Sequence, residues 1–226
     1  MSALPPPRPV GYNADMPDRI IPLESRESFE DDGPASFIEY VAAIILGSVE
    51  QVEVDDEAGY DARSLDVGIT GAFALGCAVG VEFPNRIEQV LEQVLPGEVA
   101  VVLDELRQPF ADQVAALRNS GAPLEAEAFT AEIVESLDGA DAASLEVAAT
   151  LIQQTLAYGI MLARLERATA IVLRNAMDRA QREAYEELQE LQIPDAGGDG
   201  PFETLQGVAR CIMDDYEAEI GFRSEA

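Results

Sequence analysis

The residue types that perform most enzyme chemistry are missing from this sequence. Its 226 residues include no His and no Lys, so all 14 of its positively charged side chains are Arg. Without His there can be no Ser-His-Asp nucleophile system and no imidazole metal ligand. Without Lys there can be no phosphate-loop lysine and no Schiff base. The remaining candidates for chemistry are carboxylates that bind Mg²⁺ or Ca²⁺, arginines, tyrosines and two thiols.

Two pairs of carboxylates have a spacing that could hold a divalent cation. They are Glu183 with Glu186 and Asp214 with Glu217, each three positions apart and therefore on one face of a helix. The pattern superficially resembles the magnesium site of all-α nucleotide pyrophosphohydrolases, but the order of Glu and Asp differs and no Lys is available for phosphates. A chain with 43 acidic residues produces such pairs by chance. We therefore expect solvated helical faces, and neither a metal site nor a cofactor.

A second group of polar side chains lies in or just after the most apolar part of the chain. Charged groups in such surroundings are ion-paired, extend their charged end to solvent, or serve a function. We expect ion pairs or a protein interface, where Arg is enriched, in preference to an anion-binding site. The candidate interface residues are Arg164, Arg167, Arg174, Arg179, Arg182 and Tyr185.

Most of these candidates fall on one stretch that is predicted to be a very long helix, from Ser144 to Gln192. It contains no Pro and a single Gly, Gly159, and strong helix formers fill it. Two adjacent apolar stripes in its first part predict burial on most sides. After Met177 few apolar residues remain, so we expect the last third to project into solvent or onto a partner.

Shorter helices are predicted around this central helix. One of them, at 66–83, could also be read as buried strands; helix is favoured because Gly68, Ala72, Gly76 and Gly80 recur every fourth residue. Such a stripe of small residues would let this helix approach the central helix closely. The other predicted helices span 34–53, 85–95, 98–107 with 110–120 (one kinked helix or two short ones around Pro109), 124–137 and 202–220.

The predicted fold is therefore all-α, a bundle of six to eight helices around one long central helix. We see no convincing repeat in the sequence. The predicted organisation is an extended Pro-rich acidic arm at 1–33, a helical core at 34–192 with the central helix at 144–192, and a linker with a C-terminal helix at 193–226. Cys77 and Cys211 are expected to be buried free thiols.

The first ten residues and the apolar segments bear on localisation. Prolines occupy the place where a signal peptide needs an apolar segment. The longest uncharged apolar run, Val67–Val81, is shorter than the roughly 20 residues that span a membrane. We expect a soluble protein, located in the cytoplasm or within a large assembly such as a virion.

The net charge of −29 is the most unusual property of the sequence. Such a surplus repels DNA, RNA and anionic lipid, so direct nucleic-acid binding and membrane insertion are not expected. Three explanations remain open. The acidity can reflect adaptation to high salt, where ions screen the repulsion between carboxylates; coding bias, which favours Arg over Lys; or a functional acidic face.

Three classes of function fit these observations. The first is a non-enzymatic structural or assembly protein that acts through protein contacts, is oligomeric, and belongs to a viral particle or another large complex. The second is an acidic inhibitor or nucleic-acid mimic that binds a basic partner. The third is an all-α hydrolase that depends on carboxylate-bound Mg²⁺. The missing His and Lys favour the first class.

Overall fold

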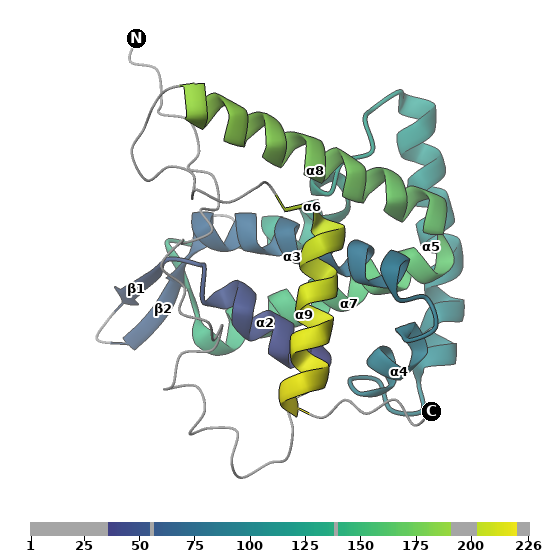
Figure 1. Ribbon diagram of the computed structural model, residues 1–226, viewed down its shortest axis with the longest axis horizontal. Coiled ribbons are helices and arrows are strands. Elements are labelled where there is room, and N and C mark those ends of the chain that lie inside the picture. The colour runs from purple at the N-terminus through teal and green to yellow at the C-terminus, as the bar shows by residue number, and fades with distance from the viewer. Residues whose placement is uncertain (1–35, 55–56, 138–139, 191–202, 221–226) are drawn as a thin grey trace.

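The computed structural model describes residues 36–54, 57–137, 140–190 and 203–220. Within these ranges the chain forms eight helices and one small three-stranded sheet, which confirms the predicted all-α class (Figure 1). The arm predicted at 1–33 and most of the linker predicted after residue 192 lie outside the described residues. In chain order the elements are α2 (Phe37–Leu46), β1 (Gln51–Val54), β2 (Glu57–Asp61), α3 (Ala62–Glu82), α4 (Ile87–Glu92), α5 (Val99–Ser120), α6 (Glu127–Glu135), β3 (Ala142–Ser144), α7 (Leu145–Leu165), α8 (Arg167–Glu190) and α9 (Leu205–Ile220).

The first helix is shorter than predicted. It begins after Ser36, whose hydroxyl accepts a hydrogen bond from the Glu39 backbone N–H, while the Glu39 carboxylate accepts one from the Ser36 N–H. It ends at Leu46, so the predicted extension to Glu53 was wrong. The alternation of Val52 and Val54 with polar neighbours suits a strand, and this segment pairs with β2.

The sheet has the order β1-β2-β3 and is antiparallel throughout. The middle strand places Tyr60 opposite Ala143, and both side chains are buried. Gly59 in this strand has no room for a side chain, because an added Cβ would lie 2.9 Å from the Ala143 carbonyl oxygen. The sheet was missed because its strands have only three to five residues.

Helix α3 is the centre of the structure. It contacts α2, α6, α7, α8 and α9, and its side chains are buried almost continuously from Ile69 to Val81. The predicted helix at 66–83 is therefore confirmed, and it begins earlier, where the Asp61 carboxylate accepts a hydrogen bond from the Ser64 N–H at 2.8 Å. Cys77 is buried in this helix as expected, whereas Cys211 is exposed, because it lies outside the inward-facing side of α9.

The predicted close approach of two backbones occurs between α3 and α7. A Cβ added to Gly76 would lie 2.3 Å from the Leu156 carbonyl oxygen, and one added to Gly159 would lie 2.3 Å from the Phe73 carbonyl oxygen. Real Cβ atoms do not approach so closely, so both glycines are needed for the helices to touch.

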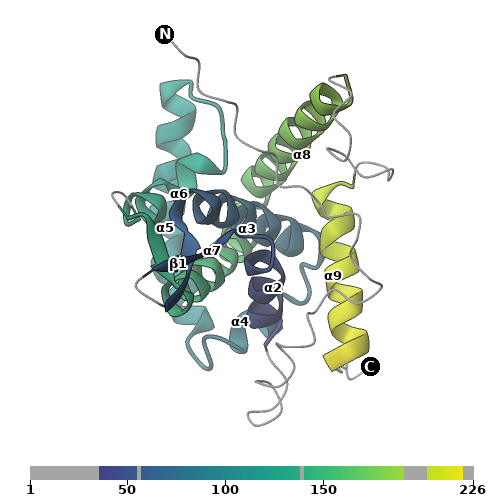
Figure 2. The same cartoon turned by 90° about the vertical axis from the view of Figure 1, so that its left-hand side faces the viewer.

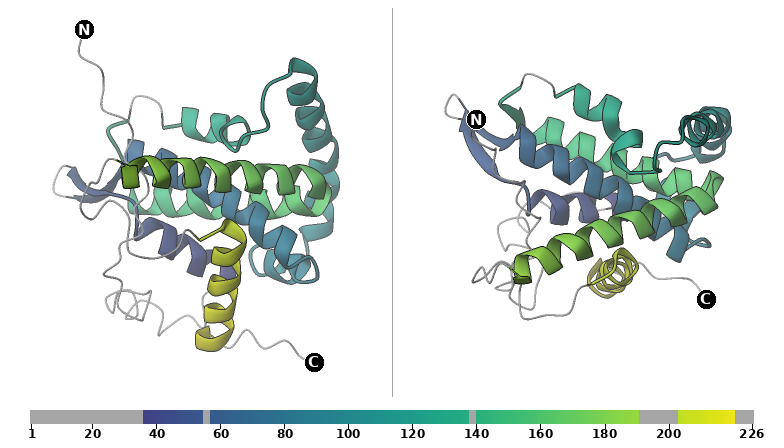
Figure 3. Two further views of the ribbon diagram at one scale, coloured as in Figure 1. Left: turned by 45° about the horizontal axis from the view of Figure 1, so that its top comes forward. Right: turned by 90° about the horizontal axis from the view of Figure 1, so that it is seen from above.

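The single long helix predicted at 144–192 was wrong. Its first part, α7, ends at Leu165, and Glu166 has non-helical backbone angles of φ −130° and ψ 55°. The chain then turns back, and α8 crosses α3 on its return (Figures 1 and 3). Packing overrides local propensity here, since the turn allows Ala170 and Leu173 to be buried in the core.

Helix α9 covers the end of α3 and is held by polar contacts as well as apolar ones. Asp178 in α8 is buried and accepts a hydrogen bond of 2.7 Å from the Leu205 N–H, which caps the start of α9. Glu82 accepts hydrogen bonds from Gln206 and Arg210. At the other end of α9, the Tyr216 ring packs edge to face on Phe37 of α2. Figure 2 shows α2 and α9 next to each other.

The remaining helices close the other side of the bundle. Helix α5 is one continuous helix that includes Pro109, and it ends at Gly121, whose φ of 70° is left-handed. Its Phe110 ring lies 4.6 Å from the Tyr158 ring. Helices α4, α6 and α9 occupy the predicted regions at 85–95, 124–137 and 202–220 but are shorter than predicted.

We predict that Gly76→Ala and Gly159→Ala each lower the free energy of unfolding by about 2 kcal/mol or more, because the new Cβ forces α3 and α7 apart. Gly71→Ala is the matched control in the same helix, since nothing lies within 4 Å of its added Cβ. It should stabilise the protein by up to about 1 kcal/mol through helix propensity. Urea unfolding of the three variants measures this, and equal effects at positions 71 and 76 would contradict the backbone contact.

Candidate interaction surface

The second half of α8 extends beyond the packed core. Residues from Arg179 to Glu187 are exposed, except for Ala184 and Tyr185, which are half-buried. Opposite charges four positions apart, Arg179 with Glu183 and Arg182 with Glu186, support the helix locally. The sequence prediction that the last third of this region projects from the core therefore agrees with the exposure of these side chains. We name residues 179–187 the distal α8 surface.

The structure separates the six candidate interface residues into two groups. Arg164 forms an ion pair of 3.0 Å with Glu88, Arg167 donates a hydrogen bond of 2.7 Å to the Val81 carbonyl, and Arg174 donates to the neighbouring Asn175. These three arginines contact their own chain. The other three belong to the distal α8 surface: Arg179 and Arg182 are exposed and Tyr185 is half-buried, and both Arg182 and Tyr185 also interact within the chain.

The four candidate metal ligands are not brought together. Glu183 and Glu186 are exposed on distal α8, whereas Asp214 and Glu217 lie on α9, which leads away from α8 in Figure 1. Glu217 is ion-paired with Arg86. Within the described ranges, no group of three or more His, Cys, Asp or Glu side chains is placed to hold a metal ion. Glu183, Glu186 and Asp214 are exposed, and Glu217 is half-buried.

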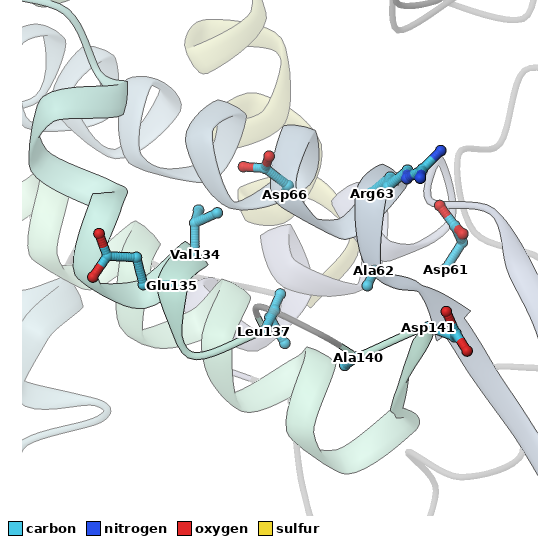
Figure 4. A pocket seen from close by; sticks show the side chains of 9 residues that line it. All are labelled: Asp61, Ala62, Arg63, Asp66, Val134, Glu135, Leu137, Ala140 and Asp141. Carbon is cyan, nitrogen blue, oxygen red and sulfur yellow. The ribbon is translucent and has the colours of Figure 1, made fainter.

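A hollow of about 610 Å³ lies where α6 and the loop before β3 face the start of α3. Its lining residues are Asp61, Ala62, Arg63, Asp66, Val134, Glu135, Leu137, Ala140 and Asp141. Figure 4 shows the carboxylates spread along the hollow and not converging on one point. The sequence did not indicate this site, because its residues come from segments that are distant in the chain and follow no motif.

Asp66, near the start of α3, lines this hollow. Partial burial raises the pKa of Asp66 above its usual value, and the nearby negative charge of Glu127 raises it further. A carboxylate with a raised pKa is a candidate proton donor or acceptor. Among the described lining residues, the other polar groups are Asp61, Arg63, Glu135 and Asp141.

Exposed carboxylates are distributed over the helices of the described chain. Examples are Glu39 on α2, Glu88 on α4, Glu105 on α5, Glu132 on α6 and Glu146 on α7, in addition to those on α8 and α9. Several arginines are meanwhile engaged with partners in the same chain. Within the described residues, the exposed negative charge is therefore not confined to one element.

Two helices, α3 and α7, are long and apolar enough to cross a membrane by length and composition alone. In the fold, 78% of the apolar window in α3 and 50% of that in α7 are buried inside the protein. The core helices of soluble proteins have the same composition, so this observation is weak evidence for a membrane span.

Comparison with known proteins adds no further assignment. The chain matches no protein family, and neither the curated proteins nor the solved structures give a match. The description of its class therefore comes from its own geometry: an all-α bundle with a small antiparallel sheet at one end.

We predict that Asp66→Asn stabilises the protein at neutral pH. The folded state raises the pKa of Asp66 above 3.8, its ordinary value, so ionisation costs more when the chain is folded. The cost is absent below pH 3.8, where the group is protonated in both states, and appears as the pH rises through the raised pKa. Urea unfolding at several pH values should show this pattern.

Asp214→Asn is the matched control for this prediction, because it makes the same change in net charge at an exposed position on α9. The stabilisation by Asp66→Asn relative to this control should disappear on acidification. A gain that is the same at all pH values would contradict the role of Asp66 ionisation.

Proposed function

We propose that this protein is a non-enzymatic assembly protein that self-associates through the distal α8 surface. The observation that carries the proposal is that most side chains of residues 179–187 are exposed, whereas Asp178 just before them is buried. A viral particle is one example of the larger complex to which such a protein would belong.

The chemistry of the surface is suited to contact between copies. It presents Arg179 and Arg182 together with Glu183, Glu186 and Glu187, so two antiparallel copies can pair Arg179 of one copy with Glu186 of the other, and Arg182 with Glu183. Tyr185 lies among them and adds an aromatic group of the kind enriched at interfaces. Its mixed charge distinguishes this surface within a chain of net charge −29.

The break at Glu166 changes the basis of the argument. The sequence suggested one rod with a polar end, whereas α8 is a separate helix that is anchored on α3 by its first half. The proposal therefore depends on the second half of α8 alone, and no longer on a rod that spans the molecule.

The two alternative functions have less support. A nucleic-acid mimic needs acidic groups ordered on one face, but exposed carboxylates occur on helices all around the described fold. A magnesium-dependent hydrolase needs its carboxylates to converge. One candidate pair lies on the distal half of α8 and the other on α9, and no metal-binding group is found among the described residues.

The test is to exchange the charges of one pair on distal α8, with the double variant Arg179→Glu, Glu183→Arg. This exchange preserves the net charge and an oppositely charged pair four positions apart, so it leaves the helix intact. Because both copies carry it, like charges then face each other where position 179 meets Glu186 and where Arg182 meets position 183. We expect analytical ultracentrifugation to show an oligomer for the wild type and at least a tenfold weaker association for the variant, a loss of about 1.4 kcal/mol.

The matched control is the exchange Asp104→Arg, Arg107→Asp on α5, where an exposed ion pair of 3.8 Å is reversed in the same way. It should leave association unchanged. Measurements over a range of salt concentrations are needed, because salt screens the repulsion between copies. A monomeric wild type at every salt concentration, or equal losses in both exchange variants, would contradict the proposal.

A further inference from the structure

The two helices that cross at the glycines are built alike. Each of α3 and α7 has 21 residues and directly follows a strand of the sheet. Each is capped by a side chain, Asp61 or Ser144, that accepts from the backbone N–H three positions later. Each ends at a residue with nearly the same backbone angles, φ −117° and ψ 57° at Phe83, and φ −130° and ψ 55° at Glu166. Both pairs of positions are 83 residues apart in the sequence.

The contacts between these helices are reciprocal under the same shift of 83 positions. Gly76 approaches the Leu156 carbonyl and the Ile160 N–H, while Gly159 approaches the Phe73 carbonyl and the Cys77 N–H. Adding 83 to the positions 73, 76 and 77 gives 156, 159 and 160, so the two sets of contacts are the same with α3 and α7 exchanged. Reciprocal contacts of this kind define a local two-fold axis between α3 and α7.

The sheet follows the same axis. In the pairing of β2 with β3, Gly59 faces Ser144 and Asp61 faces Ala142, on either side of the central pair Tyr60 and Ala143. A shift of 83 positions converts the first of these pairs into the second. The axis that relates the helices therefore also passes through the middle of the ribbon.

Burial continues the correspondence beyond the long helices. Ile87 and Val90 in α4 are buried, as are Ala170 and Leu173 at the positions 83 residues later in α8. The correspondence of α5 with α9 uses a shift of 99 positions, because α8 and the segment after it are longer. Phe110 and Val114 are buried in α5, and so are Ala209 and Met213 in α9.

The polar contacts of these last helices are equivalent too. Arg118 near the end of α5 donates a hydrogen bond to Thr169, and Glu217 near the end of α9 is ion-paired with Arg86. The positions 118 and 217 differ by 99, and 86 and 169 differ by 83. Equivalent positions in the two halves thus contact each other, although the side chains at these positions differ.

The helices of each half pack mainly on the long helix of the other half. In the first half, α2 makes most of its contacts with α7, and α4 and α5 also contact α7. In the second half, α6, α8 and α9 contact α3. Every pair is reciprocal, and Figure 3 shows the two long helices at the centre of this arrangement. Each half therefore buries much of its apolar surface against the other half.

We infer that the chain consists of two copies of one unit, at 37–120 and 127–220, joined as a fused dimer. The surface that each unit presents to the other, formed by its strand and by one face of its long helix, is a dimer interface whose partner is a second copy of the unit. This inference is independent of the proposed function. It also shows that the distal α8 surface has no counterpart, since α4 ends at Glu92, which corresponds to Asn175.

The two-fold axis is tested by a reciprocal exchange at Gly80 and Ala163, which are equivalent positions. A Cβ added to Gly80 would lie 2.5 Å from the Ala163 Cβ, so Gly80→Ala should lower the melting temperature by about 5 °C or more. The double variant Gly80→Ala, Ala163→Gly places the methyl group on the other side of the axis and should recover most of that loss. The control Gly80→Ala, Ala157→Gly should recover none of it. Failure of the first exchange to recover more than the control would overturn the two-fold relation.

The unit boundary is tested in the full chain by a protease site inserted between Ala122 and Pro123, in the exposed segment between α5 and α6. After cleavage the fragments should remain together with an unchanged circular dichroism spectrum. Their urea midpoint should then rise with protein concentration, because unfolding now separates two chains. The same protein before cleavage is the control for any association through α8. Fragments that separate as folded monomers, or a midpoint with the same concentration dependence before and after cleavage, would overturn the inference.

Discussion

The contact between the backbones of α3 and α7 at Gly76 and Gly159 is the constraint on which the rest of the structure depends. With no side chain between them, the two helices present their remaining apolar faces outward, and the other helices pack on those faces. Glycine inside a helix costs about 1 kcal/mol relative to Ala. The cost is offset because the close approach creates a central pair that can bury apolar surface on several sides at once.

This constraint also accounts for the turn at Glu166. A single straight helix from Ser144 would have placed Ala170 and Leu173 beyond the end of α3, where nothing would cover them. By turning back, α8 buries both against α3, and Arg167 donates a hydrogen bond to the Val81 carbonyl at the point of reversal. The first part of α8 therefore belongs to the core, whereas most side chains of residues 179–187 are exposed.

The sequence predicted the helical class, the glycine helix and its close partner, because small residues at every fourth position and long apolar stripes depend on local pattern. It did not predict the break at Glu166, since neither Pro nor Gly marks it and the reason for it is tertiary packing. The sheet was missed because strands as short as Ala142–Ser144 carry too little pattern. The hollow around Asp66 was missed because its lining comes from segments distant in the chain. Nor could the sequence show that Arg164 and Arg167 contact their own chain while Arg179 is exposed.

The two-fold relation was hidden in the sequence for a related physical reason. Between α3 and α7 the same residue occurs at equivalent positions only at Ile69 and Ile152, Ala74 and Ala157, and Gly76 and Gly159. Packing restricts volume and polarity at most positions, so Phe73 can correspond to Leu156 and Cys77 to Ile160 without loss of burial. Only the crossing point restricts residue identity, since no side chain other than that of glycine fits between two touching backbones. A duplicated fold can therefore keep its symmetry in burial and contacts after its sequence similarity has almost disappeared, and the glycine pair is the position where the backbone contact itself requires the same residue in both units.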